Sequence, residues 1–298
     1  MLSNRLLVTA VAPAVWGTTY LVTSEFLPPD RPLLAAVVRA LPAGLLLIAL
    51  TRGRPTGDWW WRALILGTLN IGAFLALLFV AAYRLPGGVA ATVGAIQPVL
   101  VGCLSAGLLG ERLQTRTVVA GAAGIAGVSL LVLRADARLD GLGVAAALGG
   151  AVVMALGVVL AKRWRSSAPV LATTGWQLTA GGLVLVPPLF LFEGLPSTLT
   201  GVNIAGYAYL SIIGAALAYH LWFLGIRALS PTNVTFLGLL SPVVATALGW
   251  LVLDQQLTAA QLAGGLLVLA AVVAPQLTAR EKPCASPSSV RPALSAAR

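Results

Sequence analysis

Two ionisable side chains, Arg39 and His220, lie inside long apolar stretches, where a buried charge is costly and usually serves a function. The planar guanidinium of Arg39 suits bidentate binding of an anionic group such as a carboxylate. It could equally donate a hydrogen bond to a carbonyl of a neighbouring helix or extend to the membrane surface. His220, the only histidine, could line a cavity, bind a polar solute or accept a proton. Alternatively, it joins two helices through a hydrogen bond.

The residue types also limit the chemistry. A single histidine without a cluster of cysteines or carboxylates does not make a metal site, so no metal or cofactor is expected. No Asp or Glu falls at mid-membrane depth, because Glu25, Glu111, Glu193 and Asp254 stand at the ends of apolar stretches. A buried carboxylate that exchanges a proton for a cationic drug is therefore missing. We expect passage of neutral or zwitterionic solutes, either downhill or with weaker coupling.

Further candidates for contact with a solute are polar or aromatic side chains at mid-span depth. Trp16, beside Gly17, could stack on an aromatic solute, and core packing explains it equally well. The run Trp59–Trp61 stands at a membrane boundary and is typical of an interfacial belt. The predicted substrate-binding residues are Trp16, Tyr20, Arg39, Asn70, Tyr83, Gln97, Trp176, Gln177, His220 and Ser241.

A Gly–Pro pair with the same spacing occurs twice, as Gly94 with Pro98 and as Gly238 with Pro242. A proline inside a helix removes one hydrogen bond and clashes with the carbonyl four residues earlier. A glycine at that earlier position leaves room for the bend. We therefore predict two matched, kinked helices, with these four residues as hinges.

The elements that must position these residues follow from composition. The 298-residue chain is 58% hydrophobic and only 9% charged, with a mean hydropathy of +0.93. Soluble domains carry about 25% charged residues, so the chain is predicted to be an all-α integral membrane protein. Ten segments have the length of a membrane helix. They are residues 6–24, 33–51, 62–83, 87–109, 116–133, 142–161, 169–192, 204–226, 232–253 and 258–277.

The distribution of Lys and Arg predicts the orientation, because these residues accumulate in cytoplasmic loops. With a cytoplasmic N-terminus the outer side holds only Arg31, Arg84, Arg134 and Arg138. Both termini are then cytoplasmic in a multi-pass protein of the cell inner membrane. The net charge of +10 is explained in this way, so no nucleic-acid partner is expected. The inner side holds Arg5, Arg52, Arg54, Arg62, Arg112, Arg116, Lys162, Arg163, Arg165, Arg227, Arg280, Lys282, Arg291 and Arg298.

An internal repeat divides the ten segments into two sets of five. A shift of 144 residues relates Gly94 to Gly238, and a shift of 138 places Arg39 against Gln177 and Gly44 against Gly182. Because five is odd, the second copy enters from the opposite side, as in secondary transporters with a substrate site near the midplane. The predicted units are residues 1–138, residues 139–278 and a disordered cytoplasmic tail, 279–298.

Several motifs resemble the EamA domain of the drug/metabolite transporter superfamily, over nearly the whole chain up to about residue 277. Trp16–Tyr20 with Arg39 resembles the start of the domain, and Gly110–Leu113 resembles the end of its fourth helix. Gly214–Pro231 and Leu240–Pro242 are similar to its eighth and ninth helices. Within the superfamily, the chain most resembles YddG-type bacterial exporters of amino acids, aromatic ones especially. The resemblance implies alternating access between inverted repeats.

Two positions depart from the family pattern: Gln255 replaces a usual Glu opposite Glu111, and Met154 replaces the Trp expected opposite Trp16. A mechanism that needs a symmetric carboxylate pair is therefore in doubt. The leading hypothesis is a non-enzymatic exporter of a small-molecule substrate, embedded in membrane lipid. A multidrug permease or a sugar-phosphate or nucleotide-sugar exchanger is an alternative, although only Arg39 offers a cation to the cavity. A membrane-embedded enzyme or lipid-handling protein is a third class. The oligomeric state stays open, and a monomer is compatible with the sequence.

Overall fold

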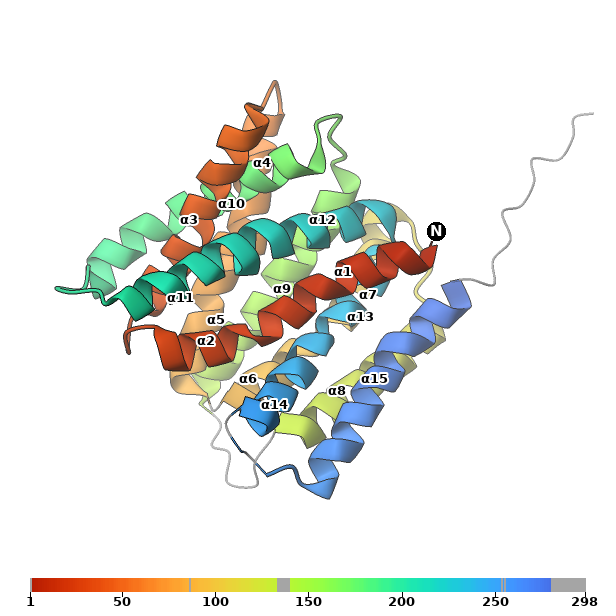
Figure 1. Ribbon diagram of the computed structural model, residues 1–298. Coiled ribbons are helices and arrows are strands. Elements are labelled where there is room, and N and C mark those ends of the chain that lie inside the picture. The colour runs from red at the N-terminus through yellow and green to blue at the C-terminus, as the bar shows by residue number, and fades with distance from the viewer. Residues whose placement is uncertain (1, 86, 133–139, 253, 255, 280–298) are drawn as a thin grey trace, which may run out of the picture.

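The computed structural model describes residues 2–85, 87–132, 140–252, 254 and 256–279, and it is a bundle of helices (Figure 1). Ten helical stretches in these residues are long and apolar enough to cross a membrane, and no strand occurs among them, which confirms the predicted fold class. Helices suit this role because all their backbone hydrogen bonds are made internally. We number the stretches as spans 1 to 10. In chain order they comprise α1 (Leu2–Gly17) and α2 (Thr19–Phe26); α3 (Pro32–Thr51); α4 (Trp59–Gly67), η1 (Thr68–Gly72) and α5 (Ala73–Arg84); α6 (Gly87–Gly94) and α7 (Gln97–Leu109); α8 (Thr115–Val132); α9 (Gly141–Arg163); α10 (Val170–Pro188) and η2 (Leu189–Glu193); α11 (Gly201–Ser211), η3 (Ile212–Leu217) and α12 (Ala218–Ala228); α13 (Pro231–Gly238) and α14 (Leu240–Val252); and α15 (Ala259–Ala279).

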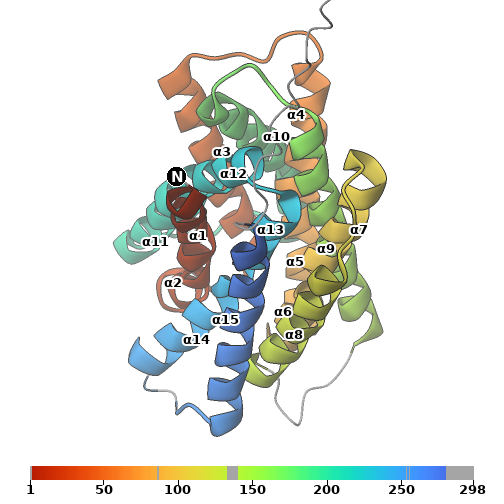
Figure 2. The same ribbon diagram turned by 90° about the vertical axis from the view of Figure 1, so that its right-hand side faces the viewer.

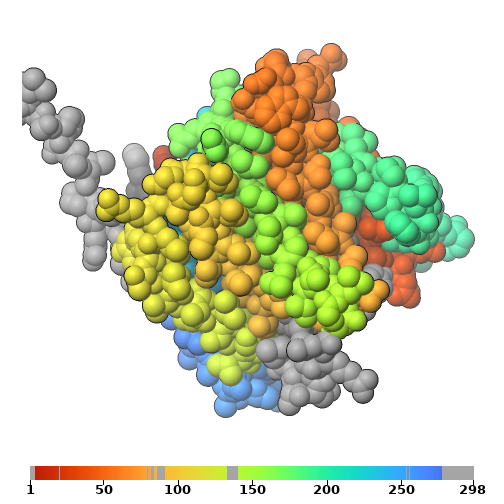
Figure 3. Space-filling model, turned by 180° about the vertical axis from the view of Figure 1, so that it is seen from behind, coloured from red at the N-terminus to blue at the C-terminus, as the bar shows by residue number. Residues whose placement is uncertain are grey.

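The spans pack in a pattern that is unchanged when each is exchanged for the span five places along the chain. The most extensive contacts join span 2 to span 7 and span 5 to span 10, seen as the neighbours α3 and α10 and the neighbours α8 and α15 in Figures 1 and 2. Span 4 contacts span 9. Span 3 packs on span 6 through α5 and α9, and its counterpart, span 8, packs on span 1 through α12 and α1. From behind, the surfaces of α5 and α9 lie side by side (Figure 3).

Glycines allow the closest of these contacts, between α3 and α10. A Cβ atom added to Gly182 would lie 2.9 Å from the Cα atom of Leu41, and one added to Gly44 would overlap the backbone of Thr179. Small residues let membrane helices approach in this way, where lipid gives no hydrophobic drive for association. Gly44 and Gly182, which the repeat aligns, therefore lie in one and the same interface.

Spans 4 and 9 are interrupted at the Gly–Pro pairs, the places where the sequence predicts kinks. Helix α6 ends at Gly94 and α7 begins at Gln97, so that Pro98 lies in the first turn of a new helix. Likewise, α13 ends at Gly238 and α14 begins at Leu240, shortly before Pro242. A proline in the first turn has no intrahelical hydrogen bond to lose. The helices are thus interrupted where kinks were predicted, and proline fits the first turn that follows each interruption.

Three segments widen to π geometry: η1 in span 3, η2 at the end of span 7 and η3 in span 8. The first residues of η1 and η3, Thr68 and Ile212, are related by the same 144-residue shift that relates Gly94 to Gly238. A π segment changes the pattern of backbone hydrogen bonds and often marks a functional position. The two halves thus share this device at matching places.

At one end of the bundle, Glu193 ties span 7 to the start of span 2. Its carboxylate accepts hydrogen bonds from the backbone N–H groups of Leu33, at 2.7 Å, and Leu34, at 3.0 Å. Arg31 donates in return to the backbone carbonyls of Glu193 and Gly194. A carboxylate at a helix N-terminus satisfies donors that have no partner within the helix. Of the predicted tail, 279–298, only Ala279 is described, as the last residue of α15; the rest of the tail and the departure at Gln255 lie outside the described residues.

Candidate functional site

The first buried polar contact joins Asn70 of η1 to Gln177 of α10. The Asn70 side-chain amide donates to the Gln177 carbonyl oxygen at 3.1 Å, and the two residues are 0% and 3% exposed. Gln177 donates in turn to the backbone carbonyl of Thr173. The side-chain oxygen of Asn70 has no hydrogen-bond partner among the described residues and lies against Gly157 of α9. Two predicted site residues are thereby brought together across spans 3 and 7.

The second contact is a carbonyl in η3 that receives two side-chain donors. The Gly214 oxygen accepts from a guanidinium nitrogen of Arg39, Nη2, at 3.0 Å and from the indole Nε1 of Trp16 at 3.1 Å. Arg39 therefore makes the interhelical carbonyl contact that the sequence left open as one of its roles. Because Trp16 belongs to α1 and Arg39 to α3, this one carbonyl ties spans 1 and 2 to span 8.

An aromatic cluster surrounds the same region, formed by Trp16, Tyr219, Trp222 and Phe223. The Trp16 ring lies 5.1 Å, centroid to centroid, from both Tyr219 and Trp222, and Tyr219 lies 6.1 Å from Phe223. The buried indole N–H of Trp222 has no hydrogen-bond partner among the described residues. The Trp222 ring also approaches Gly238, where span 9 is interrupted. Aromatic side chains and an unsatisfied N–H donor thus lie beside the interruption between α13 and α14.

Other predicted site residues have varied surroundings. Gln97 begins α7 at the break of span 4, and its side-chain nitrogen is buried without a hydrogen-bond partner in the described part of the chain. The same holds for Nδ1 of His220. The Ser241 carbonyl lies against Gly17 of span 1. The side chains of Tyr20 and Tyr83 lie outside the described residues.

Trp176 has a neighbourhood distinct from the other predicted residues. Its indole nitrogen donates to the backbone carbonyl of Gly53 at 2.8 Å, and its ring packs 6.1 Å from Trp59. These contacts join α10 to the loop that follows α3 and to the start of α4. Trp60 and Trp61 are exposed, as the predicted interfacial belt requires, whereas Trp59 turns inward and lines a pocket.

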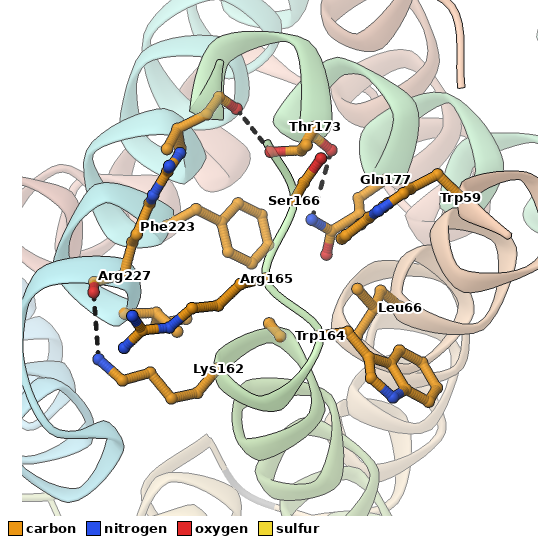
Figure 4. A pocket seen from close by; sticks show the side chains of 13 residues that line it. Trp59, Leu66, Lys162, Trp164, Arg165, Ser166, Thr173, Gln177, Phe223 and Arg227 are labelled. Atoms are coloured by element: carbon orange, nitrogen blue, oxygen red, sulfur yellow. Dashed lines mark hydrogen bonds between the residues drawn. The ribbon is translucent and has the colours of Figure 1, made fainter. Parts of the chain in front are cut away.

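We call this pocket the inner pocket, because the predicted orientation places it at the cytoplasmic end. It lies among spans 3, 6, 7 and 8, and its volume is about 50 Å³. Figure 4 shows cationic side chains at one end and Thr173 and Gln177 at the other. The pocket is lined by Trp59, Leu66, Ala161, Lys162, Trp164, Arg165, Ser166, Val170, Thr173, Gln177, Phe223, Ile226 and Arg227.

The cations of the inner pocket are absent from the site that the sequence predicts. Lys162, Arg165 and Arg227 were assigned to the cytoplasmic surface as topology signals, and Arg39 alone was expected to offer a cation to a cavity. That expectation concerned a cavity at mid-span depth and stays a prediction, whereas the inner pocket lies at the ends of spans 6 and 8. The signal available in the sequence was the run Lys162–Arg165, where a tryptophan interrupts the basic residues at the end of a span.

The comparisons with known proteins agree with this architecture. The sequence pattern of the EamA-like transporter family matches residues 5–133 and 141–274. The chain belongs to the EamA-like transporter family. Protein PecM of Dickeya dadantii (strain 3937) is 49% identical over 264 residues, which cover 88% of this chain and 89% of PecM. The superfamily that the motifs predict is thus confirmed, while the narrower resemblance to YddG-type exporters stays a prediction.

More distant relatives extend the similarity. The uncharacterized inner membrane transporter YedA of Escherichia coli (strain K12) is 30% identical over 267 residues, which cover 87% of this chain and 86% of YedA. A solved crystal structure superposes with a TM-score of 0.80 at 24% identity, over 93% of this chain and 98% of that one. At that identity the structural likeness shows the fold alone. The chain is therefore a transporter-family membrane protein with the fold expected for it.

Proposed function

We propose that the protein exports small metabolites, amino acids and aromatic ones among them, across the inner membrane by alternating access. The two halves, residues 1–138 and 139–278, act as inverted repeats that tilt against each other around a site near the midplane. The name of the relative YedA supports the inner membrane as the location. The topology proposed with it has both termini in the cytoplasm.

The observation that carries this proposal is the aromatic cluster at the break of span 9. Trp16 and Trp222 offer ring faces, and a buried indole N–H beside them has no partner in the described residues. Aromatic pairs contribute about 0.5–1.5 kcal/mol beyond the burial of area. Arg39, held close by on the Gly214 carbonyl, is a fixed cation that favours the carboxylate of an amino acid.

The need for movement follows from the size of the inner pocket. A volume of about 50 Å³ accommodates a few water molecules or a small polar group. The inner pocket does not enclose a whole aromatic amino acid, so passage of one through the bundle requires helices to move. The interruptions after Gly94 and Gly238 are suited to such movement, because helices bend where the backbone ladder is broken.

Flux through purified protein in liposomes tests the proposal. The panel comprises labelled phenylalanine, alanine and a hydrophobic organic cation. We expect phenylalanine flux well above that of protein-free liposomes. Trp16→Ala should lower it about tenfold, and Trp16→Phe, which keeps a ring and loses the donor, should lower it less. Trp60→Ala is the control, since Trp60 is 63% exposed and remote from the cluster. Equal phenylalanine flux with and without protein would refute the proposal.

Coupling is tested in the same liposomes. Because the sequence has no Asp or Glu at mid-membrane depth, we expect flux to persist when no pH gradient is imposed. Strict dependence on the gradient would rule out the uncoupled mechanism. Such a result would then direct attention to His220, the only histidine.

A further inference from the structure

The basic side chains of the inner pocket converge from two spans and the segment between two others. Lys162 lies in the last turn of α9, Arg165 follows that helix, and Arg227 lies in the last turn of α12. No acidic residue is among the lining residues. Glu111, which follows α7, is outside the lining. A cleft lined by charges of one sign concentrates ions of the other sign.

The Lys162 ammonium is held in place by the protein itself. Its nitrogen donates to the backbone carbonyl of Arg227 at 3.1 Å and to that of Leu229 at 2.6 Å. An ammonium carries three N–H donors, and these two contacts use two of them. The position of the charge is therefore fixed before any ligand binds, which reduces the entropy lost on binding.

The rest of the pocket suits a solute with an apolar body. Trp59, Leu66 and Phe223 supply aromatic and aliphatic wall, and Figure 4 shows Phe223 between the arginines and Gln177. Gln177 is also the partner of Asn70, so that the pocket leads from the charged end to the buried polar pair. Its volume of about 50 Å³ matches a carboxylate group rather than a whole solute.

We propose that the inner pocket is a carboxylate-binding site, which captures the anionic group of a solute with an apolar body before the solute moves from the cytoplasmic end toward the midplane. This movement rests on the proposed transport function, whereas the binding does not. The arginines would bind the two carboxylate oxygens through charge-assisted hydrogen bonds. The alternative is that these residues only set the topology, in which case their identity as cations on the pocket wall has no effect on binding.

Equilibrium binding to purified protein in phosphatidylcholine nanodiscs tests the site with four probes of similar size. Phenylpropanoate and phenylalanine carry a carboxylate, and phenylethylamine and phenylalaninol lack one. We expect the two carboxylates to bind and the other two to bind at least about tenfold more weakly. Arg165→Gln should weaken phenylpropanoate binding about tenfold or more, as the loss of a charged hydrogen bond predicts. Raising the salt concentration should weaken binding as well.

A matched control is Arg163→Gln, because Arg163 stands in the same helix end, is exposed and does not line the pocket. It removes the same charge from the same membrane face and should leave phenylpropanoate binding within about twofold. Arg227→Gln provides a second pocket variant, should Arg165→Gln alter folding. Equal loss in the control and the pocket variants, or equal binding of phenylethylamine, would overturn the proposal.

A further comparison separates a soluble carboxylate from an anionic lipid headgroup, which shares its chemistry. Nanodiscs that contain phosphatidylglycerol should bind phenylpropanoate within about twofold of those with phosphatidylcholine alone. Competition by phosphatidylglycerol that Arg165→Gln relieves would show a headgroup site and overturn the proposal. If binding depends on Arg165 and liposome flux is absent, the proposed function fails and the site stands. If flux is present and binding does not depend on the carboxylate, the proposed function stands and the carboxylate site fails.

Discussion

Asn70 in span 3 is hydrogen-bonded to Gln177 in span 7, and the same relation links their counterparts in the other half. Shifts of 144 and 138 residues map Asn70 onto Gly214 and Arg39 onto Gln177. Arg39 is indeed bonded to Gly214, at 3.0 Å. In the first contact a side chain of span 7 bonds to η1 of span 3, and in the second a side chain of span 2 bonds to η3 of span 8. The repeat thus preserves a joint between spans while the chemical groups in it differ.

The buried pair predicts a specific pattern of stability. Asn70→Ala leaves the Gln177 amide buried without this partner and should destabilise the protein by about 1–3 kcal/mol. Gln177→Ala should act similarly. If the two amides depend on each other, the double variant should cost clearly less than the sum of the single ones. Thermal unfolding in detergent of all four proteins measures this. Strict additivity would show that the contact contributes no coupling.

The sequence predicts the fold well because apolar length marks each span and the internal repeat indicates which spans are equivalent. The ten spans follow from apolar length, and the pairing of Arg39 with Gln177 and of Gly44 with Gly182 follows from the repeat shift. The π segments carry no such signal, since the 68–72 stretch reads as ordinary apolar helix. The sequence predicts the position of the irregularity at Pro98, because proline disturbs a helix in the same place whether the helix bends or restarts. Which of the two occurs depends on the neighbouring helices.

The candidate site was predicted less completely, because depth along a span does not say which way a side chain points. Trp176 was predicted from its depth, and its indole nitrogen bonds to Gly53, a contact that depth does not reveal; its role toward a substrate stays a prediction. Trp59 was grouped with its exposed neighbours and instead lines the inner pocket. Lys162 and Arg165 were explained fully by the positive-inside rule, which accounts for their side of the membrane and not for their convergence.

The break of span 4 allows a clean test of the hinge. A Cβ atom added to Gly94 would meet no atom within 4 Å, so Gly94→Ala fits this conformation without a clash. We expect near-normal thermal stability and phenylalanine flux lowered about three- to tenfold, since alanine restricts the backbone at the break. Gly107→Ala is the control, because Gly107 has equal space and lies inside α7. Unchanged flux in Gly94→Ala and in Pro98→Ala would remove the hinge hypothesis.

The hydrogen bonds of Glu193 to Leu33 and Leu34, which we call the Glu193 clamp, lie at the end of the bundle opposite the inner pocket and predict an effect on stability. Glu193→Ala removes two hydrogen bonds to the first turn of α3 together with a favourable interaction with the helix dipole. A loss of about 1–2 kcal/mol is expected. Glu25→Ala is the comparison, since the exposed Glu25 carboxylate accepts only from the neighbouring Ser24 hydroxyl among the hydrogen bonds of the described residues. A melting temperature equal to that of Glu25→Ala would show that Glu193 has no clamping role.

The predicted orientation decides which side the inner pocket faces, and cysteine labelling tests it. In a protein with Cys103 and Cys284 replaced by alanine, one cysteine is introduced at Ser167 or at Thr198, both exposed in loops. Ser167 follows the basic run beside the pocket, and Thr198 follows the Glu193 clamp. An impermeant maleimide added to intact spheroplasts should label the Thr198→Cys protein, and it should label the Ser167→Cys protein only after permeabilisation. The reverse pattern would place the pocket on the outer face, where it would receive solutes for uptake instead of export.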